Sequence, residues 1–335
     1  MFLNRLTRFL ILTNIIPVKI HSRTSFEFRI CSWRTLLNLF FCYGTSFVLF
    51  GYFFRPDDFK EQMEVLSFIL FALINFLIYP SLPTLMGYSL SQMDCTLFES
   101  QITASKTLLM PFLSVLCFAL ACVLQAFEWH YFETPNILQF VFDLIYHTYP
   151  CIYLNIASFC LASWIAAMSH AICRESTLLK TNVCRIKQCC NLYDNFNKSF
   201  GSLLLVLFST SSFLTIVNIF FVISTLVSGV ISEQIPMCVG LTLSAFGHLI
   251  FMLSVVLELD KVHNKMLAVA DGLDTMEETL KEEADIAKVK ILKRKILNLK
   301  PISGLGFFNI DKNSFVGMLS FAATYIVILV QFRTS

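Results

Sequence analysis

Apolar residues run along most of this chain in blocks of the length that membrane-spanning helices require. A helix needs about 20 residues to cross a hydrocarbon core of about 30 Å. Seven segments are about that long or longer: Leu36–Phe54, Val65–Tyr88, Thr107–Phe127, Phe140–Cys173, Phe200–Ile231, Pro236–Glu258 and Ser314–Phe332. No segment shows the ten-residue alternation that is typical of a membrane β-barrel. We therefore predict an all-α membrane protein with seven transmembrane helices.

The composition supports this prediction. Of the 335 residues, 56% are apolar and 14% are charged, whereas soluble domains carry about 25% charged residues. The 12 cysteines and six histidines form no spacing that is typical of a metal site. No nucleophile elbow, zinc-protease motif or phosphate-binding loop is present. The sequence therefore predicts no enzyme, cofactor, metal site or nucleic-acid partner.

The basic residues indicate the orientation in the membrane. If the N-terminus is cytoplasmic, the inner segments are 1–35, 89–106, 174–199 and 259–313, and they hold 22 of the 25 Lys and Arg residues. This asymmetry fits the positive-inside rule. Seven spans then place the C-terminus outside the cell, the reverse of a G-protein-coupled heptahelical receptor.

A cleaved signal peptide within residues 1–20 is the alternative that would invert this topology. Asn14 interrupts its apolar run, and no cleavage site with small residues follows. We expect instead an amphipathic helix on the inner leaflet.

The last span carries a stripe of polar and small side chains. Stepping back from Gln331 by three or four residues gives Val327, Ile328, Thr324, Ser320, Gly317, Ser314 and Asn313. A polar stripe in lipid has to face protein or water. The stripe alone leaves two interpretations open, a close-packed helix interface and a pore.

The same span ends in a specific motif. Thr324 and Tyr325 are followed by five apolar residues and then by Gln331 and Phe332. This pattern is the signature of the insect gustatory receptors, and residues 306–311 resemble that family's approach to its last helix. The chain is therefore similar to the insect gustatory receptor family, seven-transmembrane chemoreceptor channels related to insect odorant receptors.

The resemblance implies a ligand-gated, non-selective cation channel opened by a small-molecule tastant, with the last helix lining the pore. It implies a tetramer, of identical copies or of related receptors, in the plasma membrane of chemosensory or related neurons. Thr324, Val327, Ile328 and Gln331 would then line the pore and gate. A ring of Gln331 amides would coordinate permeating cations, and Ile328 or Val327 would form an apolar constriction. A G-protein-coupled chemoreceptor with the opposite orientation is the alternative, and a transporter would predict internal repeats that we do not find.

Four regions follow from this interpretation: a cytoplasmic segment at 1–35, a six-helix ligand-sensing bundle at 36–258, a cytoplasmic helical anchor at 259–313, and the pore helix with its tail at 314–335. Apolar residues recur at close to heptad spacing after residue 259, which predicts helices. Gly272 is expected to break them. A solvated loop helix without an oligomeric role remains the alternative for this region.

The ligand site is predicted in the outer half of the fourth span and the loop before it. Small-molecule sites are mostly apolar with a few placed polar groups, and this region gathers Trp129, Asp143, Tyr146, His147 and Tyr153. An interfacial aromatic belt is the alternative for the same residues. Ile326 stands where the sugar receptors tend to carry an acidic residue, so the resemblance favours another receptor class.

Overall fold

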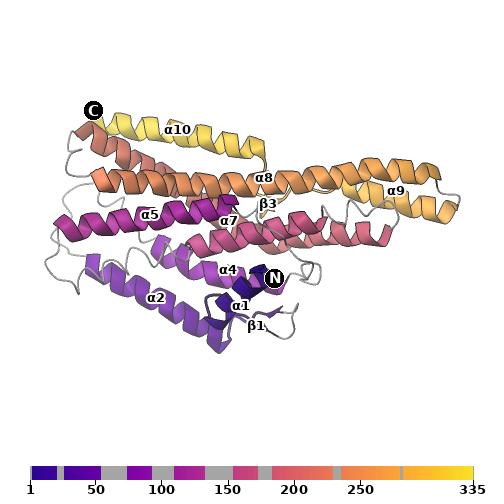
Figure 1. Ribbon diagram of the computed structural model, residues 1–335, viewed down its shortest axis with the longest axis horizontal. Helices are drawn as coiled ribbons and strands as arrows, with labels where there is room; N and C mark the ends of the chain where they lie inside the picture. The colour runs from indigo at the N-terminus through magenta and orange to yellow at the C-terminus, as the bar shows by residue number, and fades with distance from the viewer. Residues whose placement is uncertain are drawn as a thin grey trace.

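The computed structural model describes residues 2–20, 26–53, 74–92, 109–132, 154–172, 183–228, 235–279 and 282–334. Within these ranges the chain is mostly helical, with two short antiparallel hairpins (Figure 1). The elements are α1 (Phe2–Leu12), β1 (Lys19–Ile20), β2 (Phe26–Glu27), α2 (Trp33–Phe53), η2 (Ile74–Ile78), α4 (Tyr79–Ser91), α5 (Leu109–Phe132), the helix Leu154–Ile172, α7 (Val183–Ser228), α8 (Ile235–Thr279), α9 (Glu283–Leu297), β3 (Ser303–Gly304), β4 (Phe308–Asn309) and α10 (Lys312–Thr334). The predicted helical class is confirmed for this part of the chain.

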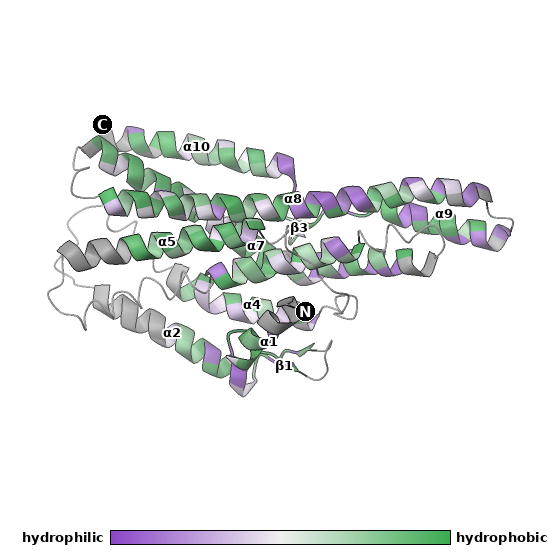
Figure 2. Ribbon diagram, viewed as in Figure 1, coloured by the Kyte–Doolittle hydropathy of each residue, from purple (hydrophilic) through white to green (hydrophobic). Residues whose placement is uncertain are grey.

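Two helices are much longer than a membrane is thick. α7 has 46 residues and α8 has 45, so each is about 70 Å long at 1.5 Å per residue. Apolar residues dominate one end of the elongated molecule, and hydrophilic residues gather on the other half of α8 and on α9 (Figure 2). Among the described residues, three helices are long and apolar enough to cross a membrane: Leu154–Ile172, Ile186–Val227 and Ile235–Thr275.

The polar end of the molecule is held together partly by ion pairs between α8 and α9. Lys290 pairs with Glu277 at 3.2 Å, and Lys293 pairs with Asp274. The hydrogen bond to Asp274 raises the pKa of the Lys293 ammonium above its ordinary value. α9 also begins with acidic residues and ends with basic ones, which suits the helix dipole.

The expectation that Gly272 breaks a helix is wrong, because α8 continues through it to Thr279. A helical glycine costs about 1 kcal/mol relative to alanine. Its neighbours Val269, Ala270 and Leu273 are buried, so the packing of this face outweighs that cost.

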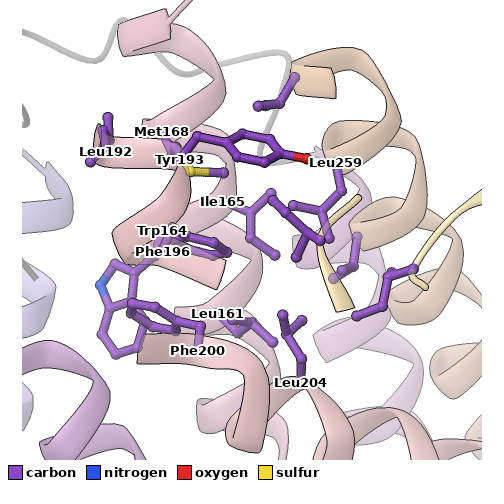
Figure 3. Packing of buried hydrophobic residues seen from close by; sticks show 14 of the residues in the cluster. Leu161, Trp164, Ile165, Met168, Leu192, Tyr193, Phe196, Phe200, Leu204 and Leu259 are labelled. Atoms are coloured by element: carbon purple, nitrogen blue, oxygen red, sulfur yellow. The ribbon is translucent and has the colours of Figure 1, made fainter. Parts of the chain in front are cut away.

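The core lies between the helix Leu154–Ile172 and the long helices. Phe196 and Phe200 stack with ring centroids 4.5 Å apart, and Trp164 meets Phe200 edge-on at 5.4 Å. Leu161 and Ile165 complete this layer (Figure 3). The first half of α7 is thereby fixed to the helix before it.

The N-terminal segment folds back onto α2. Arg34 donates hydrogen bonds to the carbonyls of Ile11 and Val18, at 3.3 and 3.2 Å. Asn38 donates to the carbonyl of Asn14 at 2.7 Å, and Asn14 itself has a φ of 60°. The turn after α1 is therefore pinned to α2, while the contact of α1 with a membrane surface stays a prediction.

A hairpin connects α9 to α10. Leu305 (φ 52°) and Gly306 (φ 81°) form its left-handed turn, between strands β3 and β4. The hairpin can lie close against α7 because the facing residue of α7 is Gly201. A Cβ built at position 201 would lie only 3.2 Å from the backbone nitrogen of Leu305. The Asn197 side chain also accepts a hydrogen bond from the Ser303 amide at 3.0 Å. This hairpin sets where α10 begins.

Candidate functional site

α10 lies along α7 and α8 and uses one face to do so (Figure 1). Phe315 and Met318 are half-buried against the core, and Ala322 is 8% exposed. Among the described side chains of α10, Ala322 is the only buried one. Most of this apolar helix is therefore left uncovered by its own chain.

The uncovered face includes the polar stripe predicted from the sequence. Its members Asn313, Gly317, Ser320 and Thr324 are exposed, whereas Ser314 is half-buried. Ala322 lies nine positions before Gln331, which is two and a half turns at 3.6 residues per turn. The two side chains are therefore on opposite sides of the helix. The stripe thus points away from the side that packs on α7, and packing within the same chain does not explain it.

Two hydroxyls of the stripe are satisfied by the helix itself. Ser320 donates to the carbonyl of Val316 at 3.0 Å, and Thr324 donates to the carbonyl of Ser320 at 2.9 Å. Such bonds let a hydroxyl sit in an apolar setting without the cost of an unpaired polar group. The same face also carries the amides of Asn313 and Gln331, each with two N–H donors, so protein or water suits it better than lipid.

The predicted gate and motif residues lie toward the end of α10. Val327 is 55% exposed and Ile328 39% exposed, and Gln331 is also exposed. Tyr325 is exposed and its ring lies 4.6 Å from that of Phe321. The side chain of Phe332 lies outside the described residues.

The predicted ligand-site residues are not placed by the structure. Asp143, Tyr146, His147 and Tyr153 lie outside the described residues, as does the side chain of Trp129 near the end of α5. This part of the prediction therefore stays a prediction. In the described part of the chain, no three His, Cys, Asp or Glu side chains lie where they could hold a metal ion.

The base of α10 is anchored by polar contacts. The carboxylate of Asp311 accepts a hydrogen bond from the Ser314 amide at 2.7 Å, which caps the helix N-terminus. Lys312 forms an ion pair with Asp260 of α8 at 2.6 Å. The first turn of α10 is thus tied to the polar half of α8.

A cavity of about 320 Å³ lies beside this base. It is partly open to the outside and is lined by the middle of α7, one residue of α8, the end of the β3–β4 hairpin and the first turns of α10: Phe208, Ser209, Ser212, Val256, Phe308, Asn309, Ile310, Asp311, Ser314, Phe315, Met318 and Phe321. Sequence reasoning did not find this cavity. Its only signal is the pair of small residues, Ser209 and Ser212, on the face of α7 that α10 meets.

The family assignment rests on a match over most of the chain. A family model described as 7tm chemosensory receptor matches residues 96–335. The chain belongs to the 7tm chemosensory receptor family. The recognition of an insect chemoreceptor from the last span is thereby confirmed at the level of the family.

Two solved structures of an insect chemoreceptor share the fold. The olfactory receptor OR5 from Machilis hrabei is similar with a TM-score of 0.67 at 13% identity, covering 99% of this chain and 98% of that one. The same receptor in complex with eugenol is similar with a TM-score of 0.65 at 13% identity, with the same coverage. No curated protein matches this chemosensory receptor in sequence. The likeness therefore shows the fold of an insect olfactory receptor, over nearly the whole length of both chains.

Proposed function

We propose that this chemosensory receptor is a gustatory-type, ligand-gated, non-selective cation channel opened by a small-molecule tastant. The observation that carries the proposal is the exposed stripe on α10, directed away from the rest of the chain, in a helix that ends in the motif Thr324-Tyr325 to Gln331-Phe332. An apolar helix with a polar outer face needs a partner or water on that face. Four copies around an axis would supply both.

In this arrangement the end of α10 forms the pore. Gln331 side chains from four copies would make a ring of neutral amides, whose oxygens coordinate cations. The ring carries no fixed charge, so we expect weak selection among monovalent cations. Ile328, or Val327 beside it, would form an apolar constriction that conducts only when it widens and becomes hydrated.

Opening requires that α10 moves relative to α7. Its packing supports such a movement, because only one face of α10 contacts its own chain and the described side chains there are mostly half-buried. The base is tied to α8 by Lys312 and Asp260. Outward displacement of the helix end about this base would widen the constriction.

The likeness to an olfactory receptor that was solved with eugenol supports a small organic molecule as the ligand here. We propose the plasma membrane of chemosensory or related neurons as the location, and a tetramer of this chain or of this chain with related receptors as the assembly. A G-protein-coupled receptor with a cytoplasmic C-terminus is less well supported, because the fold is that of an insect olfactory receptor.

The first test is orientation and conduction in the same cells. An epitope tag placed after Ser335 should stain in intact cells, and a panel of tastants should evoke currents that persist when sodium is replaced by potassium and vanish when both are replaced by a large organic cation. A tag that stains only after permeabilisation, with surface delivery shown independently, would contradict the proposed topology. Gln331→Ala should change the relative permeability of monovalent cations, whereas Leu319→Ala, about 120° around the helix from Gln331, should not.

A further inference from the structure

The cavity at the base of α10 has the size and chemistry of a ligand site. Its 320 Å³ is about twice the 150 Å³ of an apolar cavity that holds benzene, and it falls at the lower end of the range for small-molecule pockets, about 300–1,000 Å³. A molecule with the bulk of one or two rings would fill it.

The lining defines what such a molecule would be. Four phenylalanines contribute aromatic rings, and Val256, Ile310 and Met318 add aliphatic and thioether surface. The polar groups are few. The hydroxyl of Ser212 donates to the carbonyl of Phe208 at 2.7 Å and also lies against the sulfur of Met318. The carboxylate of Asp311 accepts a hydrogen bond from the Ser314 amide, and the side chains of Ser209 and Asn309 are exposed. None of the described residues that line it is Lys or Arg, so an anion would find no cationic partner.

We propose that this cavity is a binding site for a neutral, mostly apolar molecule of one or two rings' bulk that carries one hydrogen-bonding group. Its described lining shares no residue with the ligand site predicted at the outer half of the fourth span. It is built from α7, α8, the β3–β4 hairpin and the first turns of α10. Its occupancy does not depend on the proposed channel function.

A molecule bound at this site would affect the position of α10 relative to α7. Ser314, Phe315, Met318 and Phe321 all lie in the first turns of that helix and all line the cavity. A bound molecule would contact both α10 and α7, so its affinity depends on how the two helices are spaced. A ligand shifts a conformational equilibrium by the ratio of its affinities for the two states. If α10 lines a pore, as proposed above, the occupant modulates the response to a tastant bound elsewhere.

The test is photolabelling of the purified receptor in lipid nanodiscs with a phenol that carries a trifluoromethyl diazirine. Labelled residues are located by peptide mass spectrometry. We expect the label to concentrate in the peptides around residues 208–212 and 308–321. The site-specific labelling should saturate with probe concentration, whereas labelling of lipid-facing side chains should rise linearly.

Two variants fill the cavity from opposite walls. Ser212→Phe on α7 and Met318→Trp on α10 should each lower the saturable labelling at least about tenfold, since a factor of ten corresponds to only 1.4 kcal/mol. Val316→Trp adds bulk at an exposed position of α10 outside the described lining, so it should retain most of the labelling. Size-exclusion profiles and thermal unfolding midpoints identify any variant that fails to fold, and the second filling variant then decides.

Competition distinguishes two sources of the same chemistry. Displacement of the probe by 2-naphthol but not by oleyl alcohol, which is neutral like the proposed ligand, would assign the site to free small molecules, and the reverse would assign it to a membrane lipid chain. Labelling that never saturates, or that is equally strong in both filled variants, would overturn the proposal. The readout needs no current, so specific labelling of a receptor that does not conduct would refute the channel and leave this site standing.

Discussion

The contact between Gly201 and the β3–β4 hairpin gives a prediction whose sign follows from the structure. A Cβ at position 201 would lie 3.2 Å from the backbone nitrogen of Leu305 and 3.4 Å from the carbonyl oxygen of Ser303. These are backbone atoms, so no side-chain rotation relieves the contact. In Gly201→Ala, alanine gains about 1 kcal/mol of helix propensity, but overpacking costs about 1–3 kcal/mol. We expect a net loss of up to about 2 kcal/mol of stability.

The matched control is Gly272→Ala, also within a long helix. A Cβ there meets nothing within 4 Å, so only the propensity gain of about 1 kcal/mol remains. Thermal unfolding in detergent should show a lower midpoint than wild type for Gly201→Ala and an equal or higher one for Gly272→Ala. If Gly201→Ala were stabilised as much as the control, the hairpin would not be seated on α7 as described.

Two further predictions concern the contacts of α8 with α7 and with the base of α10. The Tyr193 hydroxyl lies 3.2 Å from Nδ1 of His263 and donates to the carbonyl of Lys300 at 3.1 Å. Tyr193→Phe should therefore lower the unfolding free energy by about 0.5–1.5 kcal/mol. An unchanged denaturation midpoint would show that this hydroxyl does not stabilise the protein. Lys312→Glu places like charges against Asp260 and should shift the half-maximal agonist concentration by up to about fivefold, the factor for an exposed pair worth about 1 kcal/mol. Adding Asp260→Lys should restore the wild-type dose–response curve, and a double variant no better than the single one would refute the coupling.

The sequence predicts which side chains of α10 share a face, because all residues of one helix follow the same period of 3.6 residues per turn. The stripe from Asn313 to Gln331 follows from 3.6 residues per turn, and the buried Ala322 lies on the opposite side, as that period requires. The turn before α10 is likewise a local feature, since Gly306 adopts a positive φ that favours glycine.

Features that depend on several segments at once could not be predicted in the same way. The cavity exists because α7, α8, the hairpin and α10 converge, and its lining comes from residues as far apart as Phe208 and Phe321. The continuity of α8 through Gly272 depends on burial of its neighbours against the bundle, which local propensity does not contain. The close approach of Leu305 to Gly201 also joins positions more than a hundred residues apart.

The most direct test of the account is the accessibility of α10 to a permeant-sized charged thiol reagent during agonist-evoked current. Gln331→Cys and Thr324→Cys lie on the exposed stripe, Ala322→Cys lies on the side packed within the chain, and the unmodified receptor controls for native cysteines. We predict that a cationic methanethiosulfonate applied outside the cell irreversibly changes the current of both stripe variants and leaves Ala322→Cys unaffected. Modification of Ala322→Cys alone, or no effect at either stripe position, would contradict a pore lined by this face of α10.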